Sequence, residues 1–120
     1  SQAMVAAMRR YLQPGARYLV EVDEVPIYYL QDYLDAEPRQ FTSTFLINYR
    51  AADGRVLTGT AGYVAAIRAG YFRVVCYDRQ VTPDLDNTIQ RVLQADPDYR
   101  LAATIPYGNG AGSYYIWVKR

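Results

Sequence analysis

Hydrophobic spacing and helix-boundary signals along the chain predict four helices. In the first segment, Val5, Met8 and Leu12 recur at the i, i+3, i+7 spacing of one helical face. The clearest helix start is Thr82-Pro83-Asp84, because threonine caps a helix, proline suits its first position and aspartate favours its positive end. The expected helices are residues 5–12, 26–34, 58–69 and 83–93.

Short apolar runs rich in β-branched and aromatic residues separate these helices and predict strands. The run 71–77 is the most apolar, which indicates burial on both faces, as in a parallel sheet. The glycine-rich segment 108–112 has the length of a hairpin loop between the last two strands. The expected strands are residues 18–23, 41–49, 71–77, 99–105 and 113–118.

The alternation of helices and strands predicts a single α/β domain over residues 1–120. We expect three layers, with a mostly parallel, four- to five-stranded sheet, helices on both faces and right-handed crossovers. The C-terminal antiparallel hairpin is expected to add an edge strand. Ser1, Gln2 and Ala3 precede Met4 in the pattern that a cloning remnant would leave, so we expect the chain to be part of a longer polypeptide.

The amino-acid composition excludes several kinds of functional site but says little about the fold. The chain has no histidine and one cysteine, so it lacks the commonest general base and cannot build a zinc site or an internal disulfide from thiols. Cys76 lies in an apolar run and is expected to be a small core residue. Balanced charge, 13 basic against 12 acidic residues, argues against a nucleic-acid partner. We therefore expect no cofactor and no metal, and a soluble chain, because no segment reaches the roughly 20 apolar residues that cross a bilayer.

Polar residues at the carboxyl ends of the predicted strands are the main candidates for a ligand site. Asp23 and Glu24 end the first strand, and Tyr77, Asp78 and Arg79 end the third. Ligands of doubly wound sheets bind in the crevice at these strand ends, and two carboxylates held about 5–9 Å apart can act on a sugar. The alternative is structural, with Glu24 in a helix start and Asp78 in a solvated loop.

Other candidates lie on the predicted helices. Thr58 opens the third helix, where free N–H groups can hold an anion, or it is an ordinary cap. Tyr28 on the second helix offers a ring for a sugar, although half-buried packing explains it equally well. Arg9, Arg10 and Arg17 cluster near the start, where they suit either a lipid headgroup layer or a solvated helix face.

Several stretches in the expected order resemble one family. It is the soluble C-terminal region of bacterial, especially actinobacterial, membrane glycosyltransferases of the dolichyl-phosphate-mannose–protein mannosyltransferase type (glycosyltransferase family 39-like). No single stretch is a specific motif; the string of them, covering most of the chain, carries the resemblance. The stretches are residues 14–19 (PGARYL), 27–30 (IYYL), 58–59 (TG), 65–72 (AAIRAGYF), 97–100 (PDYR), 105–106 (IP) and 115–117 (YIW).

The resemblance implies a membrane enzyme that moves a sugar from a polyprenyl-phosphate carrier to an acceptor outside the cytoplasmic membrane. In such enzymes the catalytic acidic residues lie in loops between early membrane helices, so no catalytic residue transfers to this chain. The chain is then expected to be an extracytoplasmic accessory domain that aids acceptor recognition or stability. Its expected partners are the transmembrane part of the same polypeptide and a glycan or protein acceptor.

Two other functions remain open from the residues alone. One is a stand-alone module that binds a small molecule or carbohydrate in the strand-end crevice around Asp23 and Asp78. The other is a small sugar-processing enzyme that uses Asp23 or Glu24 with Asp78.

Overall fold

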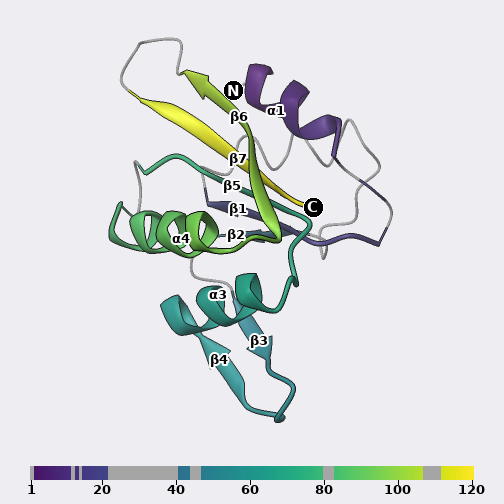
Figure 1. Cartoon of the computed structure of the whole chain (residues 1–120), viewed down its shortest axis with the longest axis vertical. Helices are drawn as coiled ribbons and strands as arrows, with labels where there is room; N and C mark the ends of the chain where they lie inside the picture. Colours follow the sequence, from purple (N-terminus) through teal and green to yellow (C-terminus); the bar gives the residue numbers. More distant parts are fainter. Residues whose placement is uncertain are drawn as a thin grey trace.

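The computed structural model describes residues 2–11, 13, 15–21, 41–43, 47–79, 83–106 and 112–120, and shows a layered α/β fold (Figure 1). Five of its strands form one mixed sheet, and two more form a separate hairpin. The described elements are α1 (Gln2–Arg9), β1 (Tyr18–Glu21), β2 (Phe41–Ser43), β3 (Asn48–Arg50), β4 (Val56–Thr58), α3 (Gly59–Arg68), β5 (Val74–Tyr77), α4 (Pro83–Ala95), β6 (Tyr99–Pro106) and β7 (Ser113–Lys119).

The strand order of the main sheet is β2-β1-β5-β7-β6. Strands β2, β1 and β5 pair in parallel, and β7 pairs antiparallel with both β5 and β6. The C-terminal hairpin is present as predicted, and its first strand, β6, forms an edge of the sheet in antiparallel pairing with β7. Its second strand, β7, lies inside the sheet and runs antiparallel to β5 as well, so the sheet is mixed.

Burial explains this arrangement. Ile116, Trp117 and Val118 of β7 are all buried, because their side chains alternate between two covered faces. On β6, by contrast, Arg100 and Leu101 are exposed, which suits an edge position.

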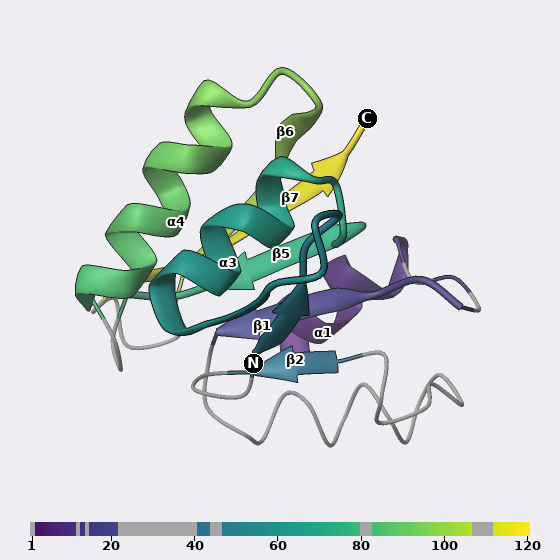
Figure 2. The same cartoon turned by 90° about the horizontal axis from the view of Figure 1, so that it is seen from below.

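Helices cover both faces of the sheet, as expected for three layers. Helix α1 lies on one face, and α3 and α4 lie on the other (Figures 1 and 2). The second predicted helix, residues 26–34, lies outside the described residues. Within the described part of the chain, no helix combines the length and apolarity needed to cross a membrane.

The predicted strand 41–49 is in fact two strands of different sheets. Its first residues form β2, whereas Asn48–Arg50 form β3, which pairs with β4. The Asp53-Gly54 turn closes this hairpin, with Gly54 at φ +89° and Asp53 bonded to the Arg55 side chain at 2.7 Å. Because of this turn, β4 pairs with β3 in a separate hairpin and not with a strand of the main sheet.

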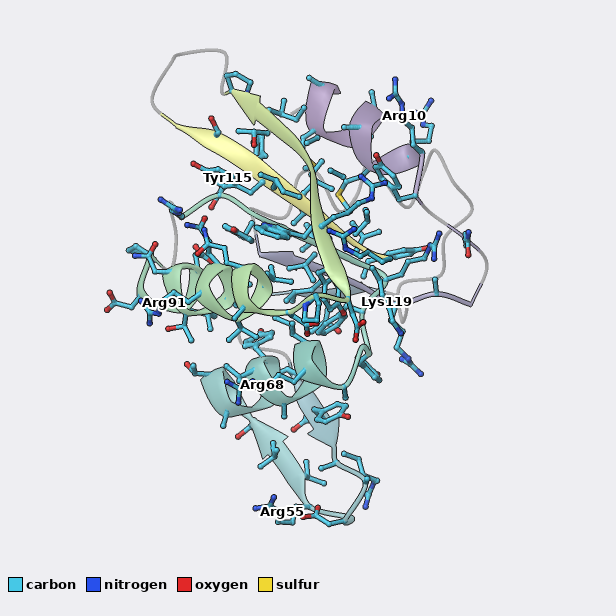
Figure 3. All side chains as sticks on the ribbon, in the orientation of Figure 1. Arg10, Arg55, Arg68, Arg91, Tyr115 and Lys119 are labelled. Atoms are coloured by element: carbon cyan, nitrogen blue, oxygen red, sulfur yellow. The ribbon has the colours of Figure 1, made fainter. Side chains whose placement is uncertain are left out.

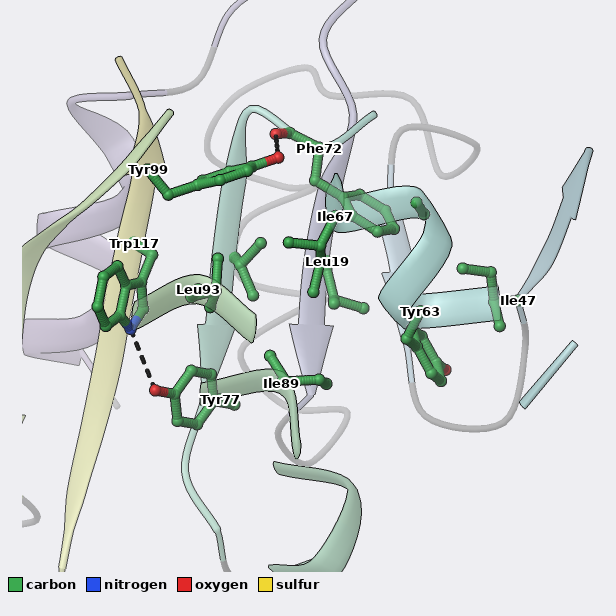
Figure 4. Close-up of a cluster of buried hydrophobic side chains, with 12 residues drawn as sticks. Leu19, Ile47, Tyr63, Ile67, Phe72, Tyr77, Ile89, Leu93, Tyr99 and Trp117 are labelled. Atoms are coloured by element: carbon green, nitrogen blue, oxygen red, sulfur yellow. Dashed lines mark hydrogen bonds between the residues drawn. The ribbon is translucent and has the colours of Figure 1, made fainter. Parts of the chain in front are cut away.

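Each face of the sheet has its own core. The α1 core contains Met4, Val5, Met8, Tyr18, Val20, Val74, Cys76, Tyr114, Ile116 and Val118. The α3–α4 core contains Leu19, Ile47, Tyr63, Ala66, Ile67, Phe72, Val75, Tyr77, Ile89, Leu93, Tyr99 and Trp117 (Figure 4). Cys76 is completely buried, as predicted, and burial raises the pKa of its thiol far above the ordinary range.

The ends of α3 follow the sequence signals in part. Thr58 occupies the N-cap position, but its side chain makes no capping hydrogen bond. Gly70 follows the C-cap Ala69 at φ +71°, and its N–H donates to the Ile67 carbonyl at 2.9 Å. Gly70 therefore occupies the C′ position after the helix, where a positive φ favours glycine.

Candidate functional site

The structure describes three of the six residues predicted to bind a ligand. Tyr77 ends β5 and Asp78 follows it directly, so these two lie together at the carboxyl end of a parallel strand. Thr58 is exposed and ends β4, in the separate two-stranded sheet. The other three, Asp23, Glu24 and Tyr28, lie outside the described residues.

The hydroxyl of Tyr77 is used inside the protein. It donates to Oε1 of Gln90 at 2.9 Å and accepts from Nε1–H of Trp117 at 3.1 Å (Figure 4). Burial raises the pKa of Tyr77 well above its usual value, so the ring stays neutral. The side chain of Asp78 is also largely buried, at 8% exposure. Both residues are therefore part of the buried interior of the domain.

Replacing Tyr77 with phenylalanine is expected to destabilise the domain by about 1–3 kcal/mol, because the indole N–H of Trp117 loses its acceptor inside the core. Urea unfolding followed by circular dichroism measures this change. The double variant Tyr77→Phe/Trp117→Phe is the control, since removing both partners leaves no unpaired indole N–H. A single variant as stable as the wild type would show that the bond contributes nothing.

Arg79 and Tyr115 complete this end of the sheet. The Tyr115 ring stacks on Tyr77 at 5.4 Å between centroids, and the Arg79 guanidinium carbon lies 5.0 Å from the Tyr115 centroid. Arg79 adopts φ +70°, a conformation that a residue with a Cβ rarely takes. Tyr115 thus already has two close neighbours, which reduces the ring surface left for a sugar.

A basic pocket lies at the opposite end of the sheet, where β1 and β5 begin and β7 ends. Its volume is about 450 Å³, and none of its lining residues is acidic. Figure 3 shows Lys119 at this end, on the same side as Arg10 and away from Tyr115. We call this site the basic pocket; its lining residues are Gln13, Gly15, Ala16, Arg17, Gly70, Tyr71, Arg73 and Lys119.

Backbone pairing brings the three charges of the basic pocket side by side. The N–H of Arg73 donates to the Arg17 carbonyl at 2.8 Å, and the N–H of Lys119 donates to the Arg73 carbonyl at 2.9 Å. These bonds extend the β1–β5 and β5–β7 ladders by one residue. Three cationic residues therefore form a row across three adjacent chain segments.

Local contacts hold each cationic side chain of the basic pocket. The Arg17 guanidinium carbon lies 4.8 Å from the centroid of the Tyr71 ring. Nε of Arg73 donates to the Tyr11 carbonyl at 3.3 Å, just beyond α1, and Nζ of Lys119 donates to the Gly70 carbonyl at 3.2 Å. None of these three bases forms a salt bridge with an acidic residue of the described ranges.

The sequence contained a weak signal for the basic pocket. Arg17 was considered only as part of the N-terminal arginine cluster, and Arg73 and Lys119 were not identified. Each of the three residues lies at a boundary of a strand: before β1, before β5 and at the last residue of β7. Basic residues are common at strand ends, so only the register shows that these three share one site.

A second hollow lies between α3 and α4. This open groove of about 440 Å³ is lined by apolar residues of both helices together with Arg68, Arg91 and Asp96 (Figure 3). The Arg91 guanidinium donates to Thr88 Oγ1 at 3.2 Å. The groove thus mixes both signs of charge, unlike the basic pocket. Across the described ranges, no group of histidine, cysteine or carboxylate side chains is arranged to hold a metal ion.

Comparison with known proteins does not assign this chain to a family. No protein-family model, no curated protein sequence and no solved structure matches this chain.

Proposed function

We propose that this chain is an extracytoplasmic accessory domain of a membrane glycosyltransferase that takes a sugar from a polyprenyl-phosphate carrier. The observation that carries the proposal is the basic pocket beside the end of α1. The nearly neutral chain concentrates Arg17, Arg73 and Lys119 there, with Arg10 exposed next to Tyr11, the residue that Arg73 contacts. In this proposal the basic end lies against the membrane, where arginine and lysine side chains are attracted to anionic lipid headgroups.

The strand-end residues support an accessory role over a catalytic one. Tyr77 ends β5 and Asp78 follows it directly; both are buried, and the Tyr77 hydroxyl is bonded to Gln90 and Trp117. A group that works on a substrate needs to reach it. The string of family-like stretches, including the residues around Gly70 and Tyr71, adds the glycosyltransferase context.

The native reading frame tests the proposal directly. We expect the polypeptide encoded upstream of Met4 to contain several apolar segments of roughly 20 residues each. In membranes that carry this full-length protein, transfer from a polyprenyl-phosphate sugar is expected to fall when Arg17 and Lys119 are both neutralised. Neutralising Arg50 and Arg91, exposed bases far from the basic pocket, is the matched control. A native chain that begins near Met4 and turns over sugar substrates unaided contradicts the proposal.

A further inference from the structure

We infer that the basic pocket is a binding site for a phosphate ester, either a phosphomonoester or a phosphodiester. The inference deepens the proposed function and rests on it for the source of the phosphate, but the geometry of the pocket stands independently. Three observations support the inference. The three basic residues repel one another, their side chains present hydrogen-bond donors, and Gly70 leaves space for the lysine ammonium group.

Placing three like charges in a row is unfavourable in the empty protein. Arg17, Arg73 and Lys119 follow one another across hydrogen-bonded neighbours, a position in which like charges repel and destabilise a sheet. Among the described residues that line the pocket there is no carboxylate to relieve this repulsion. A bound anion removes the repulsion, so relief of this cost adds to the binding free energy.

The three side chains present donors suited to a phosphate group. Only Nε of Arg73 is engaged by the Tyr11 carbonyl, which leaves its two terminal amino groups for an anion. The Arg17 guanidinium lies over the Tyr71 ring, a cation–π contact that pairs it with no hydrogen-bond acceptor. Guanidinium groups bind phosphate oxygens through two parallel hydrogen bonds, and the lysine adds a third positive charge.

Gly70 shapes the basic pocket around the lysine. A Cβ at this position would lie 2.7 Å from Nζ and 3.0 Å from Cε of Lys119. The absence of a side chain therefore lets the ammonium group sit against the Gly70 carbonyl at the pocket wall. The helix-ending glycine thus has a second role, since it fixes the position of a phosphate-binding charge.

Hydrogen bonds between Tyr18 and Gln13 attach the segment before β1 to the sheet. The buried Tyr18 hydroxyl donates to the Gln13 carbonyl at 2.7 Å and accepts from the Gln13 N–H. The Tyr18 backbone pairs with Val74 of β5. Both walls of the pocket are therefore attached to the main sheet, which lowers the entropy cost of organising the site.

Titration of the whole chain with sodium phosphate and with glycerol 1-phosphate, followed by amide NMR shifts at constant ionic strength, tests the site. We expect shifts at residues 15–17, 70–73 and 119. The variants Lys119→Met and Arg17→Gln should each weaken binding by roughly tenfold or more, because each removes a charge-assisted hydrogen bond. Arg68→Gln/Arg91→Gln, which removes two charges at the α3–α4 groove, should leave the affinity unchanged.

A second arm identifies the source of the phosphate. The chain is co-sedimented with phosphatidylglycerol vesicles and, in parallel, with phosphatidylcholine vesicles. Stronger binding to phosphatidylglycerol that is lost in Lys119→Met identifies a lipid headgroup as the source. Binding of glycerol 1-phosphate without vesicle binding assigns a free phosphate ester. Gly70→Ala, which displaces Lys119 but keeps all charges, should weaken binding in either case.

Absence of binding in both arms, with the variants folded by circular dichroism, would overturn the inference. Binding that survives Lys119→Met and Arg17→Gln would overturn it as well. The result is separable from the proposed function. Membrane spans upstream of Met4 without phosphate binding would leave the proposed function standing, whereas phosphate binding by a chain that lacks such spans would leave only the site.

Discussion

Replacing Phe72 with alanine is expected to lower the free energy of unfolding by about 3–5 kcal/mol, a large share of the stability of a small domain. The Phe72 ring is completely buried in the α3–α4 core (Figure 4), and the cavity left by its removal is lined by α3 and the sheet. Chemical denaturation followed by circular dichroism measures the loss.

The neighbouring Tyr71 provides a matched control for Phe72. It is 37% exposed and contacts Phe72 edge-on at 5.1 Å between ring centroids. Tyr71 also contacts Tyr49 edge-on at 5.3 Å, and each aromatic pair contributes about 0.5–1.5 kcal/mol. Tyr71→Ala is therefore expected to cost about 1–3 kcal/mol, less than Phe72→Ala. Equal losses for Tyr71→Ala and Phe72→Ala would mean that the α3–α4 core does not depend on Phe72 as described.

The second large effect is expected on the reactivity of Cys76. The thiol lies in the α1 core beside Met4 and Met8, and its burial holds the pKa far above the range of an exposed thiol. A thiol reagent at about pH 8 should therefore label the native chain only when α1 lifts from the sheet. Met8→Ala, which costs about 2–5 kcal/mol, should raise the labelling rate by at least roughly 30-fold.

A variant on the other face distinguishes local lifting of α1 from global unfolding. Leu93→Ala removes a buried side chain from the α3–α4 core and should cost a similar free energy. If α1 opens locally, Leu93→Ala accelerates Cys76 labelling much less than Met8→Ala does. A thiol that reacts as fast in the native chain as in urea would refute the burial of Cys76 under α1.

Local patterns in the sequence predicted the elements well. Pro83 begins α4 as expected, and Ile89 and Leu93, two of its three buried residues, recur at the i, i+4 spacing of one helical face. The apolar run before Tyr77 forms a strand buried at every position. Such features depend on neighbouring residues in the chain, so spacing and end signals are sufficient to identify them.

The arrangement of the strands was harder to predict, because strand order is not encoded locally. The segment 113–118 reads as a strand whether it lies at an edge or inside the sheet. The useful signal was that Ile116, Trp117 and Val118 are consecutive and apolar, which suits burial on both faces. The break between β2 and β3 went undetected because residues 41–49 are rich in strand-forming residues throughout.

The candidate site was even harder to predict from the sequence than the strand order. Tyr77 and Asp78 were selected because polar strand ends line the crevice of many α/β proteins, yet both are buried here. The basic pocket forms from residues 17, 73 and 119, which are far apart in the sequence and individually ordinary. The pairing register, which places Tyr18 opposite Val74 and Val74 opposite Val118, makes their backbones neighbours at one end of the sheet.

The interior position of β7 also has a consequence for the order in which the protein is made. Translation proceeds from the N-terminus, so β1, β5 and β6 emerge from the ribosome before the strand that belongs between the last two. Until Ser113–Lys119 emerges, β5 has an open edge and β6 has no partner among the strands described. An open strand edge can pair with another chain, so a chain truncated before residue 113 is expected to aggregate more readily than the 120-residue chain.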